Sequence, residues 1–506
     1  MSELIKKAVR VLLLAVISYT LICCILVSCT LMVYADSTAT TPGIKSIKTG
    51  TFSLMLKNDG TVWAWGYNNL GMLGDGTADN ANRPVKVSID DMKEISAGNY
   101  FAMALKNDGT VWVWGSNFNG EHGDGTTYPP TEKSYQFLSI PSLPRQVPDL
   151  NDVKKIAAGD SCFAIKNDGT IWAWGKNTLG ELGDGTLTAR SIPVQVTGLV
   201  NIISISNSAA HTLALDNNGK VWAWGSNAHG ELGNNSADKV NDRGYKYAAT
   251  PVSVPIDNVV AIATGQGFSL AIKNDGTVWA WGDNEFGELG DGTRTSRADP
   301  SPIPGLNNVV KIEASRLVSM ALKSDGTLWL WGLDANGLAN QMAFDGATYT
   351  NTLDTPKQIK LIDGVKEFAL GGDDVLAMKN DGTLWAWGNN WYGQLGIGTF
   401  SNENIKKAKV MTPIKVLVDS NTIIEPGQDS NPPYETEIPT ATPVNSTDQS
   451  PQAVGTPTPI THADPNLNGT DGQTSHGNPF DIKLICFIGL AGIAIVAIYL
   501  WYRRYK

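Results

Sequence analysis

Residues 57–66 read Lys57-Asn58-Asp59-Gly60-Thr61-Val62-Trp63-Ala64-Trp65-Gly66. The Asp-Gly pair tolerates the positive φ angles of a tight turn, which is a strong short-range signal for a β-hairpin. The run before it, Leu54-Met55-Leu56, and the run from Val62 to Trp65 consist of strand-forming residues. This stretch therefore predicts two antiparallel strands joined by a tight turn.

The hairpin recurs seven times along the chain. The first tryptophan of each copy is Trp63, Trp112, Trp172, Trp222, Trp279, Trp329 and Trp385. Successive copies are 49 to 60 residues apart, which is a spacing typical of β-propeller blades. The strands are apolar on both faces, so neighbouring blades must cover them. Because side chains alternate along a strand, we expect both indoles of a copy on one face, packed between blades against small residues.

Each copy continues with a glycine-rich turn such as 68–77, a Pro-x-x-Val strand such as 84–87, and an Ile-x-x-Gly segment such as 95–98. Four strands per unit can be drawn in this way. The first copy is preceded by Ile44-Lys45-Ser46-Ile47 and the last is followed by Pro413-Ile414-Lys415-Val416. We expect these two segments to share one blade and so remove the free sheet edges. The prediction is an all-β fold, a seven-bladed β-propeller over residues 44–419, closed by pairing of its N- and C-terminal strands.

The repeated string Asp-Gly-x-Val-Trp-x-Trp-Gly-x-Asn-x-x-Gly-x-Leu-Gly resembles the regulator of chromosome condensation repeat family over about residues 44–418. The resemblance implies a seven-bladed propeller that binds proteins. The eukaryotic founder of the family is a nuclear exchange factor for a small GTPase, whereas the tryptophan-rich style of this chain resembles bacterial, exported members, one of which binds β-lactamases. The repeats of the family have a histidine just before the Ser-Leu-Ala-Leu strand, and in this chain only His211 corresponds to it.

Both ends of the chain carry apolar segments. Basic residues precede an apolar run at 11–33, which predicts a signal peptide over residues 1–35. Two alternatives stay open, an uncleaved signal anchor and a lipoprotein whose lipid is attached to Cys29. Residues 483–502 are long enough and apolar enough for a transmembrane helix, and the basic tail 503–506 predicts a cytoplasmic C-terminus.

The segment between the repeats and the second apolar run, residues 420–482, is rich in Pro, Thr and Ser. Such a composition cannot bury enough apolar surface to fold, so we expect a disordered stalk. The resulting prediction is a single-pass protein of the cell membrane with an extracellular propeller.

Composition excludes several functions. The net charge of −10 and the pI near 5.1 argue against nucleic-acid binding. Of five cysteines only Cys162 lies in the repeat region, which leaves no disulfide there. The three histidines of that region are not at the spacing of metal ligands, so we expect no metal site and no cofactor, and we expect His122 and His229 to be exposed in their turns.

Catalysis is also not expected. No Gly-x-Ser-x-Gly motif is present. Glu181, Glu231 and Glu288 recur at one position of the repeat, and such symmetry favours a scaffold role because an active site usually breaks the symmetry of its repeats. We interpret the recurring Gly-Asp-Gly-Thr as a structural turn for the same reason.

Specificity is expected in the asymmetric inserts at 127–145, 236–250 and 340–355, because aromatic side chains on loops are frequent binding hot spots. The candidate partner-binding residues are Tyr128, Tyr135, Phe137, Arg243, Tyr245, Tyr247, Phe344 and Tyr349. Alternatively, these loops only cap blade edges. The predicted function is a monomeric, membrane-anchored module of the cell surface that binds an extracellular protein without catalysis; the alternative is a module that binds cell-wall polysaccharide or another carbohydrate.

Overall fold

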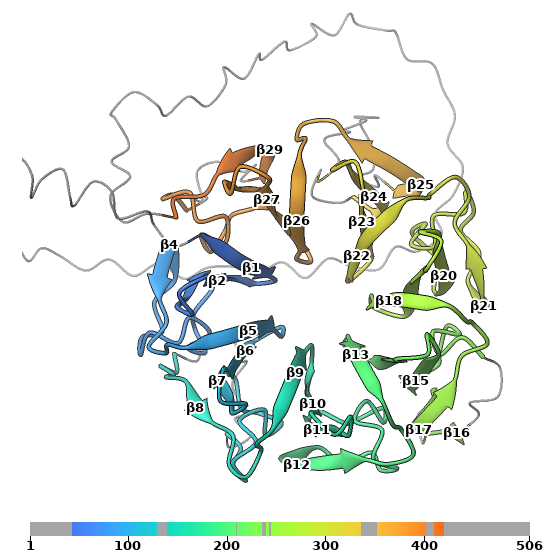
Figure 1. The fold of residues 1–506 in the computed structure, drawn as a ribbon, viewed down its shortest axis with the longest axis horizontal. Helices are drawn as coiled ribbons and strands as arrows, with labels where there is room; N and C mark the ends of the chain where they lie inside the picture. Colours follow the sequence, from blue (N-terminus) through green and yellow to red (C-terminus); the bar gives the residue numbers. More distant parts are fainter. Residues whose placement is uncertain are drawn as a thin grey trace, which may run out of the picture. The chain divides into compact units, whose positions relative to one another are not determined.

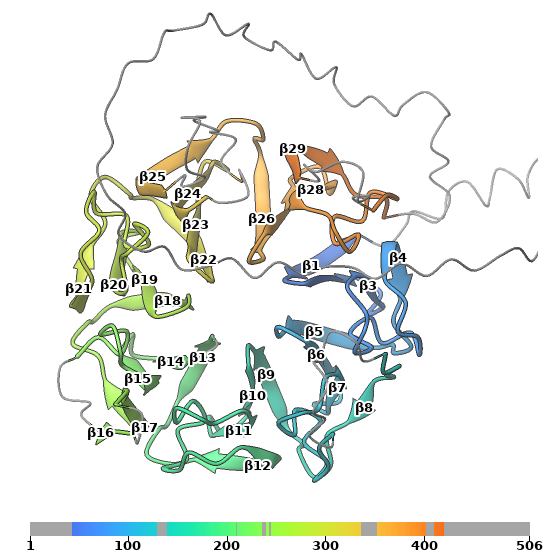
Figure 2. The ribbon, with the colours of Figure 1, turned by 180° about the vertical axis from the view of Figure 1, so that it is seen from behind.

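The computed structural model describes residues 43–128, 139–208, 210–234, 239–241, 244–334, 338, 352–400 and 409–418. These residues form seven antiparallel sheets around a central axis, so the predicted seven-bladed propeller is confirmed (Figure 1). Blade 1 consists of β1 (Ile44–Thr49), β2 (Phe52–Lys57), β3 (Val62–Gly66) and β4 (Ala81–Lys86). In every blade the first strand lies nearest the axis and the fourth strand lies at the outside, as the view from behind also shows (Figure 2).

The other blades repeat this order. Blade 2 contains β5 (Met92–Ala97), β6 (Phe101–Lys106), β7 (Val111–Gly115) and β8 (Arg145–Gln146), and blade 3 contains β9 (Val153–Ala158), β10 (Ser161–Lys166), β11 (Ile171–Gly175) and β12 (Arg190–Val196). Blade 4 contains β13 (Ile202–Asn207), β14 (His211–Asp216), β15 (Val221–Ser226), β17 (Lys246–Ser253) and the extra edge strand β16 (Lys239–Val240). Blade 5 contains β18 (Val259–Thr264), β19 (Phe268–Lys273), β20 (Val278–Gly282) and β21 (Arg297–Pro302). Blade 6 contains β22 (Val309–Ser315), β23 (Val318–Lys323), β24 (Leu328–Leu333) and β25 (Thr352–Ile359), and blade 7 contains β26 (Val365–Leu370), β27 (Asp374–Lys379), β28 (Leu384–Asn389) and β29 (Lys409–Lys415).

The Asp-Gly hairpin turns have the predicted geometry. Gly60 has a φ of 80°, and its N–H donates to the carbonyl oxygen of Lys57 at 3.0 Å. The Asp59 carboxylate accepts hydrogen bonds from the backbone N–H and the hydroxyl of Thr61 at 2.9 and 2.7 Å. Because strand direction alternates within each blade, these turns all lie on one face of the propeller, which we call the turn face. The glycine-rich turns between the third and fourth strands lie on the opposite face, the loop face.

The apolar core is divided into clusters that lie at the junctions between blades, and a buried indole belongs to each. The second tryptophan of every repeat is fully buried, as in Trp65, Trp114, Trp174, Trp224, Trp281, Trp331 and Trp387. At the junction of blades 1 and 2, for example, Trp114 packs in one cluster with Ala64. The expected packing of indoles against small residues is therefore confirmed for this position.

The first tryptophan of each repeat is only half-buried. In five blades a lysine ammonium lies over its ring, as in Lys273, whose Nζ is 3.9 Å from the ring centroid of Trp279. These rings thus form the outer, partly solvated margin of each junction, where a cation can cover the indole face.

The prediction that the first and last strands share a blade is wrong. β1 pairs with β2, and β29 pairs with β28. The Ile-x-x-Gly strand pairs with the hairpin that follows it instead of completing the preceding unit, so the chain from 44 to 415 divides into seven whole blades. Packing without strand pairing closes the ring between blades 7 and 1: the indole of Trp65 and the hydroxyl of Ser53 both donate to the carbonyl oxygen of Gln394, at 2.8 and 2.9 Å.

The predicted terminal segments, 1–35, 420–482 and 483–502, lie outside the described residues. Within the described part of the chain, no helix has the length and apolar character needed to cross a bilayer.

A pair of substitutions in blade 3 tests the role of the buried indole. The indole of Trp174 donates to the carbonyl oxygen of Glu121 in blade 2 at 2.8 Å, whereas that of Trp172 donates to Thr170 in its own strand pair at 3.3 Å. We expect Trp174→Phe to lower the free energy of unfolding by about 2–4 kcal/mol, because it leaves a gap at the junction and leaves the buried carbonyl oxygen of Glu121 with only the weak S–H donor of Cys162, at 3.5 Å.

The matched change Trp172→Phe should cost about 1 kcal/mol or less, since its partner is half-exposed and water can replace the bond. Urea unfolding followed by circular dichroism measures both variants. Equal destabilisation by the two changes would contradict the proposed role of the interblade bond.

Candidate functional site

The loop face is hollowed around the axis. The hollow has a volume of about 1010 Å³ and is lined by the turns between the first and second strands of the blades, together with parts of the glycine-rich turns. Several charged groups that line it are paired: Lys176 bonds Asp160 at 2.9 Å, and Arg316 bonds Asp373 at 3.3 Å. The hollow therefore offers surface for contact rather than a cluster of free reactive groups.

Aromatic side chains gather on one side of this hollow, on blades 7, 1 and 2. We call them the aromatic rim, and they are Tyr67, Tyr100, Phe118, Trp391 and Tyr392. Trp391 is 63% exposed, Tyr100 49% and Tyr392 39%. The rings of Tyr67 and Tyr392 lie 4.6 Å apart with a tilt of 51°, so this contact bridges the junction between blades 7 and 1.

The aromatic rim breaks the symmetry of the repeats. Trp391 and Phe118 occupy the same position of the glycine-rich turn, where blades 3 and 4 have Thr178 and Ala228. The backbone of the turn is the same in all these blades, so the scaffold does not require an aromatic residue there. A break in the symmetry of the repeats indicates a functional surface. The sequence predicts it in the insert loops, whereas the structure has it in the glycine-rich turns.

The turns that carry the aromatic rim are held rigidly by an asparagine. In blade 1 the Asn68 side chain accepts a hydrogen bond from the N–H of Leu73 at 2.9 Å and donates to the carbonyl oxygens of Thr77 and Asp79 at 3.3 and 3.0 Å. Asn390 makes the corresponding contact with Leu395 at 3.1 Å. A turn fixed in this way presents its aromatic side chains with little entropy left to lose on binding.

The recurring glutamates have the structural role that their symmetry predicts. Glu181, Glu231 and Glu288 are buried, and each carboxylate accepts a hydrogen bond from the backbone N–H two residues earlier, at 2.6 to 2.8 Å. In blade 7 the amide oxygen of Gln394 accepts the same bond from Tyr392 at 3.0 Å. The position therefore shapes the glycine-rich turn in these four blades, and in blade 7 it does so directly below the aromatic rim.

Burial of these carboxyl groups shifts their titration. Desolvation raises the pKa of Glu121 and Glu181. It raises the pKa of Glu288 to about 7, and one oxygen of that carboxyl has no hydrogen-bond partner among the described residues.

The recurring Gly-Asp-Gly-Thr motif is a structural turn, as expected. In blade 1 the Asp75 carboxylate accepts hydrogen bonds from the N–H and the hydroxyl of Thr77 at 2.9 and 2.8 Å. Among the residues that the structure describes, no group of three or more His, Cys, Asp or Glu side chains could hold a metal ion.

The structure describes three of the eight predicted partner-binding residues. Tyr128 is half-buried, and its hydroxyl donates to the carbonyl oxygen of Gly115 at 3.3 Å. Tyr245 is 53% exposed, whereas Tyr247 lies half-buried in β17. Tyr128 belongs to blade 2 and the other two to blade 4, so they do not form one site. The remaining five lie outside the described residues: Tyr135, Phe137, Arg243, Phe344 and Tyr349.

The two turn histidines differ. His229 is exposed as predicted, with 51% of its side chain accessible. The prediction for His122 is wrong, because this residue is fully buried and its Nε2 lies 3.1 Å from the carbonyl oxygen of Gly115. His122 occupies the position of Leu73 in blade 1, where the side chain points into the junction. Desolvation there lowers the pKa of His122 to about 4.

Comparison with known proteins identifies the repeats. A family model described as an RCC1-like domain matches residues 90–431, and one described as the regulator of chromosome condensation (RCC1) repeat matches residues 59–105. The human E3 ubiquitin-protein ligase HERC2 is 28% identical over 271 residues, which are 49% of this chain and 5% of the ligase. The mitochondrial RCC1 domain-containing protein RUG3 of Arabidopsis thaliana is 28% identical over 55% of this chain and 51% of its own length. The chain thus spans about half or less of the length of these two relatives.

A solved structure of Prp20p from Saccharomyces cerevisiae has the same fold. It superimposes with a TM-score of 0.59 at 22% identity, over 72% of this chain and 87% of that one.

The unpaired buried carboxyl of Glu288 predicts a pH dependence. The pKa is about 7 in the folded state and about 4.5 in the unfolded chain, so between these values only the folded state binds the proton. Stability therefore falls as the pH rises from about 4.5 to 7. Glu288→Gln should remove this contribution and raise the free energy of unfolding at pH 8 by about 1–3 kcal/mol, with little change at pH 4.5.

Urea unfolding of wild type and Glu288→Gln across this pH range measures the difference, in which all other titrations cancel. Blade 7 shows that glutamine fits the position, because Gln394 occupies it. If the free energies of unfolding of the two proteins changed with pH in parallel, the Glu288 carboxyl would not be protonated in the folded state by its burial.

Proposed function

The chain belongs to the family of RCC1-like domains, and from that premise we propose that it is a protein-binding propeller without catalytic activity whose partner docks on the aromatic rim. The observation that carries the proposal is the set of exposed rings on rigid turns, beside a hollow of about 1010 Å³. Large aromatic side chains at the centre of an interface supply much of its binding energy.

The geometry of the rim favours a protein over a polysaccharide. Sugars stack on flat aromatic faces, whereas the rings of Tyr67 and Tyr392 are tilted by 51° and form a stepped surface. Such a surface suits the irregular side chains of a protein partner, and the hollow beside it can accept a protruding loop. The carbohydrate-binding alternative becomes an outcome of the test below.

The known relatives support protein binding as a class of function. Prp20p of Saccharomyces cerevisiae has binding properties to Gsp1p and to histones. These partners belong to that yeast protein, and the acidic pI near 5.1 of the present chain makes a chromatin role a poor match. A propeller can change its partner by changing the residues on its turns, because function resides in the surface and not in the fold.

The location follows from the segments at the two ends of the sequence. We propose an exported protein of bacterial type with a signal segment at 1–35, the propeller at 44–419, a stalk at 420–482, a membrane helix at 483–502 and a cytoplasmic tail at 503–506. The support is the sequence alone: a basic stretch before the first apolar run and a basic tail after the second. A stalk of this kind would let the loop face meet extracellular proteins.

Alanine substitutions in the aromatic rim test the binding function. We expect Trp391→Ala combined with Tyr100→Ala to reduce capture of surface proteins by the full chain about tenfold or more, because exposed aromatic anchors are removed. Stability should change by only about 0.5 kcal/mol per site, since both side chains are exposed.

The matched control is Tyr245→Ala, which removes an equally exposed tyrosine from blade 4. Capture is measured against extracted surface proteins and against isolated cell-wall polysaccharide. Loss of polysaccharide binding alone would favour the carbohydrate alternative, and unchanged capture by the rim variant would refute the site.

The proposed membrane anchor at the C-terminal segment can be tested by cell fractionation. The full chain should stay with the membrane fraction after an alkaline wash, and deletion of residues 484–506 should release it. Protease added to intact cells should cut the propeller from its anchor. A full-length chain that fractionates as a soluble protein would contradict the proposed location.

A further inference from the structure

The turn face carries a second asymmetry, around the other mouth of the channel. It concerns the second residue of each innermost strand, at the end of the strand next to the turn face. In blade order these residues are Lys45, Lys93, Lys154, Ile203, Val260, Val310 and Lys366. Four neighbouring blades, 7, 1, 2 and 3, thus have lysine, and the three neighbouring blades 4, 5 and 6 have a branched aliphatic residue. We call these seven residues the turn-face ring.

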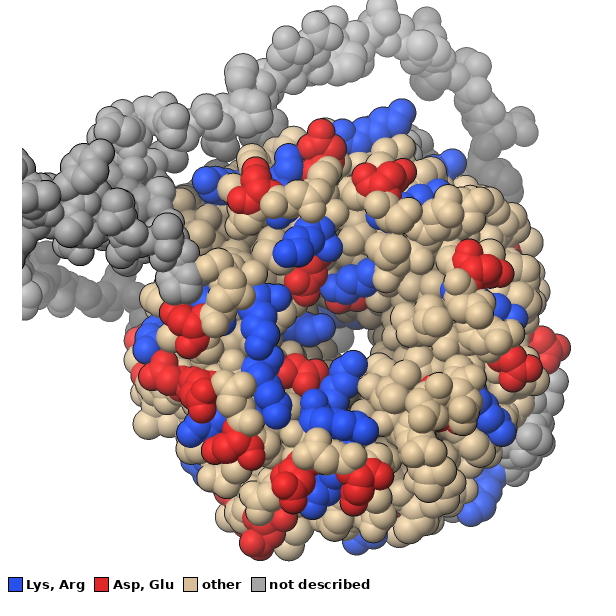
Figure 3. Space-filling model, in the orientation of Figure 1, with Lys and Arg blue, Asp and Glu red and all other residues tan. Residues whose placement is uncertain are grey.

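The two halves of the turn-face ring are open to solvent. Lys45, Lys154 and Lys366 are exposed and Lys93 is half-buried. Ile203, Val260 and Val310 are 43%, 55% and 57% exposed. Lysine and arginine side chains gather around the central opening next to β1, β5 and β9, whereas few lie next to β13 and β18 (Figure 3). Because the same backbone position accepts both residue types, the fold does not dictate this division.

The lysines of the turn-face ring form no ion pair with a carboxylate in the described part of the chain, although Lys93 is close enough to Glu94 and Asp108 to interact with both carboxylates electrostatically. Deeper in the channel, by contrast, a lysine does form ion pairs. The Nζ of Lys311 lies 2.9 Å from a carboxylate oxygen of Glu313 and 3.9 Å from one of Glu367. The channel lining is therefore balanced in charge, and the turn-face ring is not.

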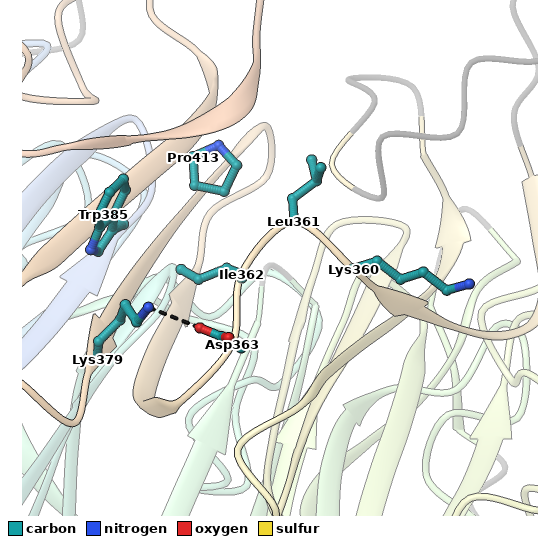
Figure 4. A pocket seen from close by; sticks show the side chains of 7 residues that line it. All are labelled: Lys360, Leu361, Ile362, Asp363, Lys379, Trp385 and Pro413. Atoms are coloured by element: carbon teal, nitrogen blue, oxygen red, sulfur yellow. Dashed lines mark hydrogen bonds and ion pairs between the residues drawn. The ribbon is translucent and has the colours of Figure 1, made fainter.

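Two carboxylates of the turn face have partners of their own. Asp91 accepts a hydrogen bond from Asn107 at 2.6 Å. Asp363 bonds Lys379 at 2.9 Å, at the edge of a small notch of about 190 Å³ between blades 6 and 7 (Figure 4). Asp152 lies two residues from Lys154 and forms no ion pair with a described residue. The net charge of the chain is −10, and the four lysines of these neighbouring blades place a group of positive charges at one side of the ring.

We propose that the turn-face ring binds an acidic segment of another protein that carries aliphatic side chains next to its carboxylates. The carboxylates contact the lysines of blades 7, 1, 2 and 3, and the aliphatic side chains cover Ile203, Val260 and Val310. Charge complementarity selects the acidic partner and increases its association rate. The apolar half requires a partner with apolar groups, which an inorganic anion or an anionic polysaccharide does not offer.

This surface is independent of the aromatic rim, because the two lie on opposite faces of the propeller. The chain would then hold two proteins at once, one on each face. The proposal does not rest on the proposed function, and the two can fail separately.

A synthetic peptide probe tests the turn-face ring on the full-length protein in detergent. The probe is a fluorescein-labelled peptide with four glutamates, a Gly-Ser spacer and Leu-Ile-Leu, and binding is followed by fluorescence anisotropy at low salt. We expect the combined change Lys45→Ser, Lys93→Ser, Lys154→Ser and Lys366→Ser to weaken binding about tenfold or more. Val260→Ser with Val310→Ser should weaken it about fivefold, and added salt should weaken it for the wild type.

The matched control changes four other turn-face lysines, Lys166, Lys220, Lys273 and Lys323, to serine. It alters the net charge equally, but these lysines lie over tryptophan rings, so binding should stay within about twofold of the wild type.

Two results would contradict the proposal. Equal weakening by the control would show that only the overall charge matters. Equal binding of a peptide with serines in place of Leu-Ile-Leu would show that the aliphatic residues of the ring do not contribute to binding. Trp391→Ala should leave probe binding unchanged, and a loss there would place the peptide on the other face.

Discussion

The structure depends on one contact, the hydrogen bond from a buried indole to a carbonyl oxygen of the preceding blade. It occurs at every junction, with a nitrogen–oxygen distance of 2.7 to 2.9 Å. A buried N–H without a partner is costly, so the indole fixes the position of the neighbouring glycine-rich turn as well as filling the junction. The bond also closes the ring, because Trp65 makes it to Gln394 of the last blade without any strand pairing across the junction.

This contact explains why one part of each turn is constant and another is free to vary. The acceptor is a backbone carbonyl, so the side chain of the accepting residue can be Glu, Gln, Met or Leu, as in Glu121, Gln394, Met72 and Leu338. Two or three residues earlier the side chains of the turn face the hollow. Blades 7 and 2 use this freedom to place Trp391, Tyr392 and Phe118 there, and the asparagine of the same turn holds the backbone beneath them.

Sequence patterns predicted the hairpins, the number of blades and the indole packing because these follow from strictly local periodicity. They did not predict how four strands group into a blade, since the segment around Ile95 could pair with the strand before it or after it, and only the sheet pairing resolves this choice. The aromatic rim was missed because Trp391 and Tyr392 lie in a turn of ordinary length, which differences in insert length do not mark. Comparison of single positions between repeats is the signal that reveals both Trp391 and the lysines of the turn-face ring.

The two faces differ because different constraints act on them. On the loop face, the chain reverses through glycine-rich turns whose backbone is fixed by the interblade bond, so variation appears in side chains that stand above a rigid base. On the turn face, the innermost strands begin with a bulge after their first residue, which releases the second residue from the sheet pattern. The scaffold therefore tolerates lysine and valine equally at that position. The fold sets no preference between lysine and an aliphatic residue at this position. The proposed partner, with its carboxylates next to aliphatic side chains, fits both the four lysines and the three aliphatic residues of the turn-face ring.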